Sequence, residues 1–373
     1  LSGKNIMLTI PTASGKSLVA HLTIAHRLKN DLEGQKALYI VPLKALATEK
    51  YNELKEIADT VDLKVGLAIG DRSGENNSIE SSDILVCTSE KLDSLLRNRS
   101  ELISKIGIIV SDEFHLIHDY GRGPTLEVLI SRIRHKKPDA QIIALSATVG
   151  NCKELAKWLD AELIYSEWRP VTLHSGTITN LEVKIHRIDG KGDDEWPEPR
   201  TIEGTNGKSL QAALDDTIKE GGQLLVFVNS RIGAQKEARE LSKYIIKKRK
   251  ENNEHTDGDK IAELERFSES LKQREDSSAL IKKLADSIKG GIAFHHAGLT
   301  TGQRNKIEEM FKDGDLHCII ATPTLAQGVN LPARRVVIRD VKRWNTAAGR
   351  NMPMPIMEIK QMLGRAGRPK YDS

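Results

Sequence analysis

A strand, a small-residue turn and a helix are predicted by the string Ile6-Met7-Leu8-Thr9-Ile10-Pro11-Thr12-Ala13-Ser14-Gly15-Lys16-Ser17. Ile6–Ile10 is a short apolar run that ends at a proline, and apolar residues recur at helical spacing from Leu18 to Leu28. Small residues in the turn let backbone N–H groups curl around a phosphate, and the N-terminus of the helix adds a partial positive charge. The string therefore indicates a nucleotide-binding α/β domain.

The turn after this first strand supplies the groups that a nucleotide needs. We expect its residues to bind the phosphates: Pro11, Thr12, Ala13, Ser14, Gly15, Lys16 and Ser17. The Lys16 ammonium can reach the β- and γ-phosphates, and the Ser17 hydroxyl can ligate Mg²⁺. Because Ile10 stands where the strict phosphate-loop pattern has its first glycine, a chance turn is the alternative for this string alone.

Two adjacent carboxylates follow another apolar run. Ile108-Ile109-Val110-Ser111 leads into Asp112-Glu113-Phe114-His115, and ligands of α/β sheets bind beyond the carboxyl ends of the strands. Asp112 is therefore placed to hold Mg²⁺, and Glu113 to orient and deprotonate an attacking water. An isolated Asp-Glu pair would be a solvated strand end, but the phosphate loop upstream favours the catalytic interpretation. His115 is either a core histidine or a link from the nucleotide site to the second domain.

A glycine- and arginine-rich string lies near the C-terminal end. Gln361-Met362-Leu363-Gly364-Arg365-Ala366-Gly367-Arg368 places two guanidinium groups three residues apart. Such groups can reach a phosphate from across a cleft, where an arginine finger contributes about 10³–10⁵ in rate. A basic surface turn is the alternative for this string alone.

The order of apolar runs predicts two α/β halves. In the first half, runs such as Ala37–Val41, Ile84–Cys87 and Ile142–Leu145 alternate with amphipathic stretches, which favours a mostly parallel sheet with helices on both faces. The second half repeats the alternation with Leu224–Val228, Ile292–Phe294, Cys318–Ala321 and Val336–Ile338. We expect a first domain over residues 1–168, a linker that could hold strands over 169–208, and a second domain over 209–373. Residues from about 247 to 290 read as an insertion of two solvated helices, with a mobile loop at 250–259.

Composition excludes several other classes of protein. The 373 residues are 39% hydrophobic and 29% charged, which is ordinary for a globular chain with a full core. No apolar run approaches the roughly 20 residues that cross a bilayer, and no signal peptide begins the sequence. Three separated cysteines give neither a disulfide framework nor a zinc site, so we expect a cytoplasmic protein without a membrane partner. The net charge of +4 permits a nucleic-acid partner without requiring one.

In their order along the chain, these strings resemble the motifs of superfamily-two helicases. Further strings resemble motif Ia (Val41-Pro42-Leu43-Lys44-Ala45-Leu46-Ala47), motif Ib (Thr88-Ser89-Glu90-Lys91-Leu92), motif III (Leu145-Ser146-Ala147-Thr148) and motif IV (Val226-Phe227-Val228-Asn229-Ser230-Arg231). The strings 112–115, 295–299 and 321–332 resemble the superkiller-like family, and 121–125 and 364–372 are most similar to its archaeal DNA-repair helicases. The resemblance runs from about residue 2 to residue 372. It does not include the family's glutamine motif, winged-helix domain or ratchet-helix domain, without which we do not expect processive unwinding.

The resemblance implies two tandem RecA-like domains with ATP and Mg²⁺ bound between them. The residues that it makes catalytic are Lys16, Asp112, Glu113, Gln361, Arg365 and Arg368. Gly328 and Asn330 would add nucleotide contacts, and Ser17 and Asp112 would hold the metal. His115, Ser146 and Thr148 would couple ATP turnover to movement.

The resemblance also implies a nucleic-acid track, because the family moves 3′-to-5′ along a single strand. Its partners would be single-stranded and branched DNA, and we expect a monomeric motor associated with the nucleoid. The expected nucleic-acid contacts are Pro42, Lys44, Thr88, Asn229, Arg231, His296, Thr322, Thr324, Trp344 and Arg350. Contacts to phosphates are independent of sequence and sensitive to salt. Each of these residues taken alone is more often a capping hydroxyl or a solvated cation.

A β-hairpin is predicted just before the arginine-rich string. Residues 345–351 have the composition of a turn, and the prolines of Met352-Pro353-Met354-Pro355-Ile356 favour an extended arm. Related helicases place a strand-parting hairpin here, so the resemblance implies that Trp344, Met352 or Met354 meets the terminal base pair. Lys342, Arg343 or Arg350 would then face phosphates. An ordinary surface hairpin is the alternative.

Other functions fit part of the sequence. An RNA helicase of the same family is the nearest, because the core motifs do not separate DNA from RNA and the 2′-hydroxyl is the physical discriminator. A nucleic-acid-stimulated ATPase could instead remodel protein–nucleic acid complexes without separating strands. A small-molecule kinase or GTPase would explain the phosphate loop but not the paired arginines.

Overall fold

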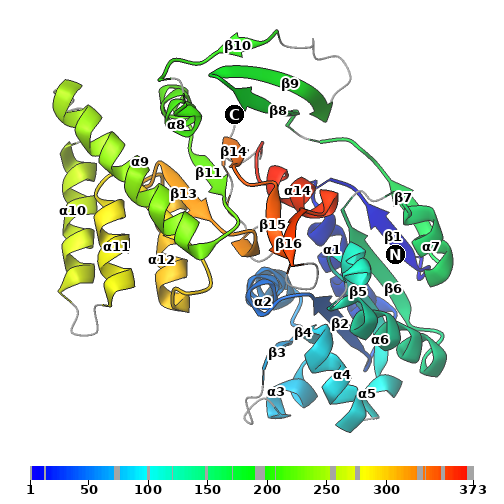
Figure 1. The fold of residues 1–373 in the computed structure, drawn as a ribbon. Helices are drawn as coiled ribbons and strands as arrows, with labels where there is room; N and C mark the ends of the chain where they lie inside the picture. The colour runs from blue at the N-terminus through cyan, green and yellow to red at the C-terminus, as the bar shows by residue number, and fades with distance from the viewer. Residues whose placement is uncertain are drawn as a thin grey trace. The chain divides into compact units, whose positions relative to one another are not determined.

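The structure is a computed structural model of the chain. It describes residues 2–11, 14–70, 76–98, 101–119, 121–147, 150–169, 171–189, 198–205, 207–252, 258–273, 278–325, 331, 333–345 and 349–367. The chain divides into two compact units, Leu1–Trp168 and Arg169–Ser373. In Figure 1 the first runs from blue to green and the second from green to red.

A seven-stranded sheet forms the centre of the first unit as far as the structure describes it. Its strands are β1 (Ile6–Thr9), β2 (Lys36–Val41), β3 (Val65–Ala68), β4 (Ile84–Thr88), β5 (Ile106–Ser111), β6 (Gln141–Ser146) and β7 (Glu162–Tyr165). They run parallel in the order β3-β4-β2-β5-β6-β1-β7. The inner strands β4, β5 and β6 are buried along their whole length, which is why they read as unbroken apolar runs.

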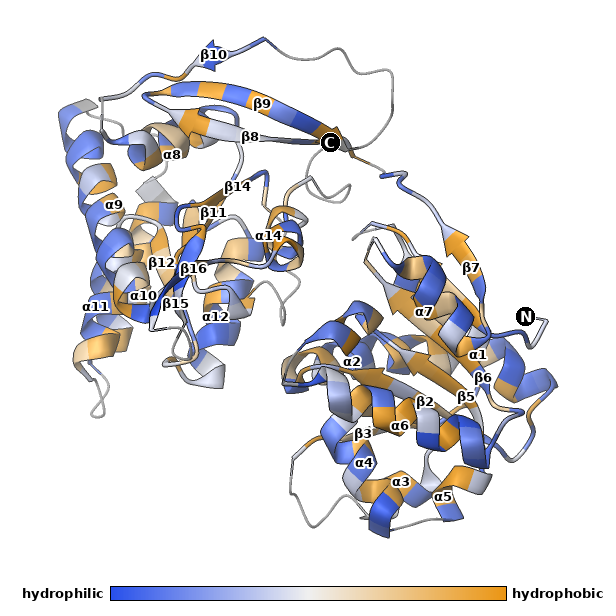
Figure 2. Cartoon of the chain, turned by 45° about the vertical axis from the view of Figure 1, so that its right-hand side comes forward, coloured by the Kyte–Doolittle hydropathy of each residue, from blue (hydrophilic) through white to orange (hydrophobic). Residues whose placement is uncertain are grey.

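Helices cover both faces of this sheet (Figure 1). They are α1 (Lys16–Asn30), α2 (Lys44–Thr60), α3 (Asn76–Ser81), α4 (Ser89–Asn98), α5 (Glu101–Ser104), the 3₁₀ helix η1 (Phe114–His118), α6 (Gly123–Lys136) and α7 (Cys152–Leu159). Successive residues of a strand point to opposite faces, so Tyr39 and Val41 pack with α1 and α2, whereas Ile40 lines a small cavity with Ser89 of α4 and Leu126 of α6. Figure 2 shows the resulting apolar strands between helices with polar outer faces.

The second unit holds a four-stranded parallel sheet in its described part. Its strands are β11 (Leu224–Phe227), β12 (Ile292–His295), β13 (Cys318–Ala321) and β14 (Arg335–Ile338), in the order β12-β13-β11-β14. The helices of this unit are α8 (Ser209–Lys219), α9 (Arg231–Asn252), α10 (Gly258–Lys272), α11 (Ala279–Ile288), α12 (Thr301–Lys312) and α14 (Ile356–Leu363). The predicted strands of both halves therefore lie in two parallel sheets.

The predicted helical insertion is α10 and α11, and one face of each belongs to the core. Leu264 and Leu271 of α10 and Leu284 and Ile288 of α11 are buried in the same cluster as β11 to β13. The Ser268 hydroxyl of α10 donates to the Ala285 carbonyl at 2.8 Å. The expectation of two solvated helices therefore holds only for their outer faces. Of the predicted loop at 250–259, residues 253–257 lie outside the described residues, and the ends belong to α9 and α10.

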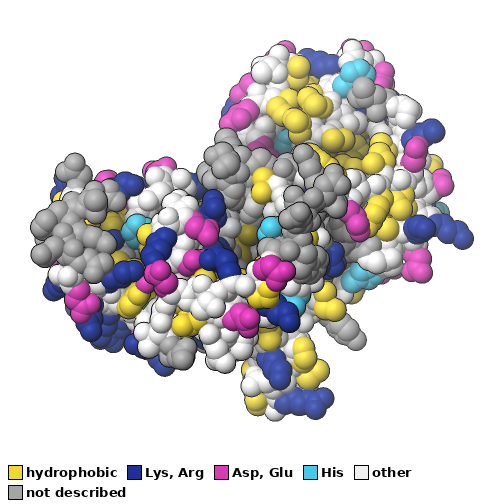
Figure 3. All heavy atoms as spheres, turned by 90° about the horizontal axis from the view of Figure 1, so that it is seen from above, with side chains coloured by type: hydrophobic (Ala, Val, Ile, Leu, Met, Phe, Trp, Pro, Cys, Tyr) yellow, Lys and Arg dark blue, Asp and Glu magenta, His cyan; other side chains and the backbone are white. Residues whose placement is uncertain are grey.

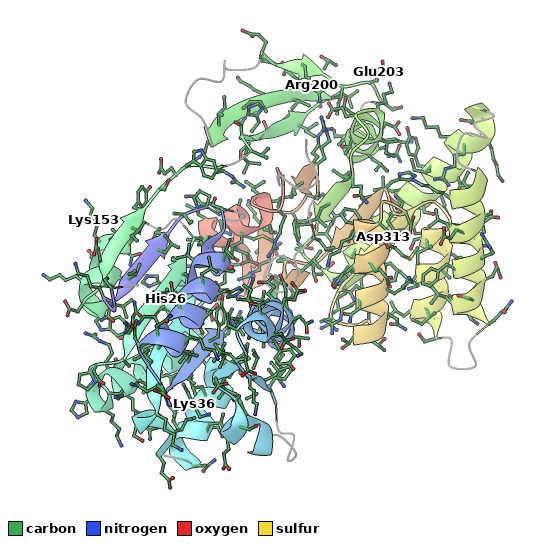
Figure 4. The ribbon with its side chains drawn as sticks, turned by 180° about the vertical axis from the view of Figure 1, so that it is seen from behind. His26, Lys36, Lys153, Arg200, Glu203 and Asp313 are labelled. Carbon is green, nitrogen blue, oxygen red and sulfur yellow. The ribbon has the colours of Figure 1, made fainter. Side chains whose placement is uncertain are left out.

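The stretch that we expected to be a linker forms a small antiparallel sheet. Its strands are β8 (Leu173–Thr179), β9 (Glu182–Asp189) and β10 (Arg200–Thr201), in the order β10-β9-β8. Leu181 and Ile202 pack against Ala212 and Ala213 of α8. Arg200 at the end of the sheet, labelled with Glu203 beside α8 in Figure 4, donates to both carboxylate oxygens of Asp216 at 2.9 and 2.6 Å. Hydrophobic and ionic contacts thus attach this sheet to the second unit.

The predicted hairpin is present at residues 342–353. Strands β15 (Lys342–Asn345) and β16 (Arg350–Pro353) pair antiparallel, with Trp344 opposite Asn351. Residues 346–348 of its turn lie outside the described residues. Among the helices that the structure describes, none combines the length and hydrophobicity that a membrane span requires.

Candidate functional site

The predicted phosphate loop lies between β1 and α1. Gly15 caps α1 with a φ of 83°, a left-handed conformation that strains any other residue. The Lys16 ammonium donates to the carbonyl oxygens of Ile10 at 2.8 Å and Pro11 at 3.2 Å, so it lies over the turn. The first turn of α1 carries no acidic residue to compete for an anion. Thr12 and Ala13 lie outside the described residues.

The acidic pair lies at the carboxyl end of β5. The Asp112 N–H donates to the Ile40 carbonyl at 2.8 Å, which ties this end of β5 to β2. Glu113 follows with a φ of 50°, an uncommon conformation for a residue other than glycine. The Glu113 N–H donates to the Asp112 carboxylate at 2.9 Å. The turn therefore presents two carboxylates at the edge of the sheet where α/β proteins bind ligands.

A tyrosine that the sequence analysis did not select joins the two expected metal ligands. The Tyr39 hydroxyl donates to the Asp112 carboxylate at 3.1 Å and also forms a hydrogen bond with Ser17. Tyr39 is fully buried on β2, and the His21 ring of α1 lies 5.5 Å from its ring. The structure thus brings together Ser17 and Asp112, which are 95 residues apart in sequence.

Lys50 is a second residue that the sequence analysis missed. This lysine of α2 is only 8% exposed, pairs with Glu53 at 2.7 Å, and its positive charge acts on Asp112. A signal for it was present, because Lys50 occupies the helical spacing of Ala47, Leu54 and Ala58 on the buried face of α2. This buried cation offsets part of the negative charge at Asp112.

The electrostatic surroundings of Asp112 raise its pKa. Burial and the neighbouring Glu113 carboxylate raise the pKa of Asp112 to about 6, while Lys50, the Glu113 N–H and Lys16 act in the opposite direction. The folded-state pKa exceeds the usual value of 3.8, so ionising Asp112 costs stability. The metal-free protein therefore loses stability as the pH rises from 3.8 to about 6. A bound cation would stabilise the ionised carboxylate and reverse that cost.

Mg²⁺-dependent nucleotide binding is therefore expected to weaken as pH falls from about 7 to about 5, because protonated Asp112 is a poor metal ligand. The measurement is the affinity of a fluorescent ATP analogue at fixed Mg²⁺ across this range. Asp112→Asn is the control, because its residual pH dependence reports titration of the nucleotide and of the other protein groups. Equal pH dependence in both proteins would contradict the assignment of Asp112.

The residues expected to couple ATP turnover to movement lie next to the acidic pair. The His115 ring is buried, its Nδ1 accepts from the Ala147 N–H at 3.3 Å, and it lies 3.5 Å from the Glu113 carboxylate. Burial lowers the pKa of His115, which favours the neutral ring that such acceptance requires. The 145–148 string thus contacts the acidic string through the Ala147 N–H, while the Ser146 hydroxyl donates to the Ala147 carbonyl at 2.8 Å. Thr148 lies outside the described residues.

The arginine-rich string follows α14 in the second unit. Gln361 lies in the last turn of α14, and the Arg365 carbonyl accepts from the Ala333 N–H at 3.2 Å. This bond connects the string to the segment that precedes β14. Gly328, Asn330 and Arg368 lie outside the described residues. Action of Gln361 and Arg365 on a nucleotide held by the first unit stays a prediction.

The candidate nucleic-acid residues of the first unit lie at one edge of its sheet. Pro42 follows β2, Lys44 begins α2, and Thr88 ends the neighbouring strand β4. The Thr88 hydroxyl accepts from the Lys91 N–H at 3.4 Å, and the Lys91 ammonium donates to the Gly70 carbonyl at 2.6 Å. Adjacent parallel strands end side by side, so these groups form a row beyond β2 and β4.

The candidates of the second unit form a comparable row beyond β11, β12 and β13. They are Asn229 and Arg231 after β11, His296 after β12, and Thr322 and Thr324 after β13. Some of their side chains have partners within the unit. His296 Nδ1 accepts from the Gly298 N–H at 3.1 Å, and the Asn229 amide donates to the Lys342 carbonyl at 3.2 Å. On the hairpin, Trp344 is 62% exposed and Arg350 is exposed.

Comparison with known proteins identifies the family. The model of the DEAD/DEAH box helicase family matches residues 1–155, and that of the helicase conserved C-terminal domain matches residues 254–370. The chain belongs to the superfamily-two helicases that carry these two domains. The predicted fold class, two RecA-like α/β domains in tandem, is thereby confirmed.

Its relatives specify the branch of this family. The chain is 44% identical over 380 residues to the ATP-dependent DNA helicase Hel308 of Methanocella arvoryzae, and 43% identical over 376 residues to that of Pyrococcus horikoshii. Both alignments cover 100% of this chain, and 48% and 47% of the relatives. The chain thus spans about half the length of these curated relatives.

Proposed function

We propose that this chain is the motor of an ATP-dependent DNA helicase that moves 3′-to-5′ on single-stranded DNA and unwinds duplexes in DNA repair or at replication forks. The contact of Tyr39 with both Ser17 and Asp112 is the observation that carries the ATP-dependent part. The names of the Hel308 relatives support DNA as the polymer. The motor acts as a monomer on single-stranded and branched DNA, in the cytoplasm with the nucleoid.

The donors at the nucleotide site fit a Mg²⁺ ion. A serine hydroxyl and a carboxylate are the oxygen ligands that Mg²⁺ accepts beside phosphate oxygens, and Ser17 and Asp112 both contact the Tyr39 hydroxyl. When bound, the ion would neutralise the charge that develops on the phosphates. Lys16 binds the β- and γ-phosphates, and Glu113 orients the attacking water and takes its proton.

The second unit supplies the remaining groups of the proposed ATPase. Arg365 and Arg368 stabilise the charge of the transition state, and Gln361, Gly328 and Asn330 contact the nucleotide or the attacking water. Hydrolysis then changes how the two units hold the strand, which shifts one unit along it. His115 and Ser146 carry the change from the acidic pair, because His115 bonds to the Ala147 N–H and Ser146 to the Ala147 carbonyl.

The proposed track binds phosphates and not bases. Hydroxyls, backbone amides and cations lie beyond the strands of each sheet: Pro42, Lys44 and Thr88 in the first unit, and Asn229, Arg231, His296, Thr322 and Thr324 in the second. On the face drawn in Figure 3, basic and acidic side chains are interspersed over most of the surface. DNA binding is therefore supported by the local rows of donors beyond the strands.

ATP turnover measured without polymer, with single-stranded DNA and with single-stranded RNA tests this function. We expect DNA to stimulate turnover more than RNA. If the protein contacts several phosphates, raising the salt from about 50 to about 200 mM should increase the DNA concentration that gives half-maximal stimulation roughly 10²–10³-fold. Equal stimulation by RNA would favour the RNA helicase, and no stimulation would favour a small-molecule kinase or GTPase. Stimulation without strand separation, in a chain to which the family's flanking domains have been restored, would indicate the remodelling ATPase.

A further inference from the structure

The root of the hairpin is fixed to the loop that follows β11. The Asp340 carboxylate, just before β15, accepts from the Asn229 N–H at 3.0 Å, and the Asn229 side chain donates to the Lys342 carbonyl at 3.2 Å. The Met354 N–H donates to the Val341 carbonyl at 2.9 Å and closes the two arms. These bonds fix the base of β15 and β16. The direction in which the rest of the hairpin points depends on other contacts.

The two faces of the hairpin carry different residues. Side chains alternate across a strand, and residues directly opposite each other share a face. Arg343 is opposite Met352, and Trp344 is opposite Asn351, so Arg343 and Trp344 point to opposite sides. Trp344 is 62% exposed, whereas the Arg343 guanidinium donates to the Glu358 carboxylate at 2.9 Å. One face of the hairpin therefore contacts α14, and the other is exposed.

The carboxylate of Glu358 is more buried than the guanidinium with which it pairs. Its side chain is 10% exposed and that of Arg343 is 49% exposed, so the carboxylate is nearly buried and its cation is not. A nearly buried carboxylate that loses its cation carries an uncompensated charge, so the pair resists separation more than a surface pair would. Glu358 lies in the first turn of α14, the helix whose last turn carries Gln361 and which ends just before Arg365. Arg343 thus reaches the element that leads to the arginine-rich string.

We infer that Arg343 is a positioning residue, whose ion pair with Glu358 makes the strand-parting hairpin follow α14. This inference rests on the proposed helicase function. A displacement of α14 during the ATP cycle is carried to the hairpin through this contact, while the Asn229 and Asp340 bonds hold the root. Arg343 therefore acts inside the unit, although the sequence placed it among the residues that face phosphates.

Removal of either partner is expected to uncouple strand separation from ATP use. The comparison is made with the family's winged-helix and ratchet-helix domains restored to the chain. In Arg343→Ala and Glu358→Gln, DNA-stimulated ATP turnover should stay within about twofold of the unaltered protein, while base pairs separated per ATP fall about tenfold. Arg343→Lys keeps a charge without the planar fork and should lose less. The exchanged pair, Arg343→Glu with Glu358→Arg, should recover most of the separation. Lys306→Ala, which removes an exposed ion pair with Glu309 on α12, is the matched control and should change neither quantity.

Several outcomes would overturn the inference. If Arg343→Ala lowers DNA affinity as much as Lys342→Ala does, and the exchanged pair recovers nothing, then Arg343 is a phosphate contact. Unchanged separation per ATP in both single variants would exclude a link through this pair. A parallel fall of ATP turnover and strand separation would show a general defect of the unit. Thermal unfolding of each variant identifies those that fail to fold, in which case Arg343→Lys supplies the comparison.

A readout that does not need helicase activity keeps this inference separate from the proposed function. The chain has four tryptophans, so fluorotryptophan labelling gives few fluorine resonances, and Trp344→Phe identifies that of the hairpin. Glu358→Gln should shift the Trp344 resonance, and the exchanged pair should return it towards its original position. No shift in Glu358→Gln would overturn the link even if the protein unwinds DNA. Absence of DNA-stimulated ATP turnover in the unaltered protein would instead contradict the proposed function.

Discussion

Lys16→Ala is expected to abolish ATP turnover while the protein remains folded. The lysine supplies the charge that meets the β- and γ-phosphates, and loss of one such preorganised donor costs at least about 10²–10³ in rate. In the structure its ammonium donates to the backbone carbonyls of Ile10 and Pro11, which lie after β1 and not within it, so removal should leave the sheet intact. Steady-state ATP hydrolysis and the thermal midpoint of unfolding are the measurements.

Glu113→Gln is the matched control for this experiment. Its amide keeps the shape of the side chain but cannot take a proton from water, so Mg²⁺-ATP binding should persist while hydrolysis is lost. The two variants thus separate phosphate binding from water activation. If Lys16→Ala hydrolyses ATP at the unaltered rate, the 11–17 turn is not part of the nucleotide site.

Arg365→Ala is expected to slow ATP hydrolysis on the order of 10³-fold, with a moderate change in nucleotide affinity. The reason is that an arginine finger acts on charge that develops in the transition state, and contributes less to the bound ground state. Arg368→Ala should behave in the same way. Single-turnover hydrolysis, measured together with the affinity of a fluorescent nucleotide, gives both quantities.

Arg365→Lys refines this test, because lysine keeps the charge and loses the planar fork of donors. A large loss in this variant would show that geometry matters as well as charge. Normal hydrolysis with weakened DNA binding in Arg365→Ala would place the residue on the nucleic-acid track. That result would leave the assignment of Lys16 and Glu113 untouched, because those residues belong to the first unit.

The apolar runs of the sequence predicted most strands of the two parallel sheets. Strands buried on both faces must be apolar along their length, so β4, β5 and β6, and β11, β12 and β13 of the second unit, stand out as unbroken runs. β3 and β7 carry a weaker signal and were not predicted. β7 lies at an edge of the sheet and is largely exposed, and β3 alternates between buried and half-buried residues.

The helicase motifs could be read from the sequence because each is a contiguous string whose spacing follows from one strand, turn or helix. That is why the chain alone led to the family, the phosphate loop and the acidic pair. Tyr39 and Lys50 belong to no such string. Helical spacing indicates that Lys50 is buried, but the contacts of both residues with the Asp112 region depend on how β2 and α2 pack in the fold. The same holds for Arg343, whose partner lies 15 residues away on α14. Backbone periodicity specifies which side chains share a face, but the charge that a side chain meets depends on which elements pack together.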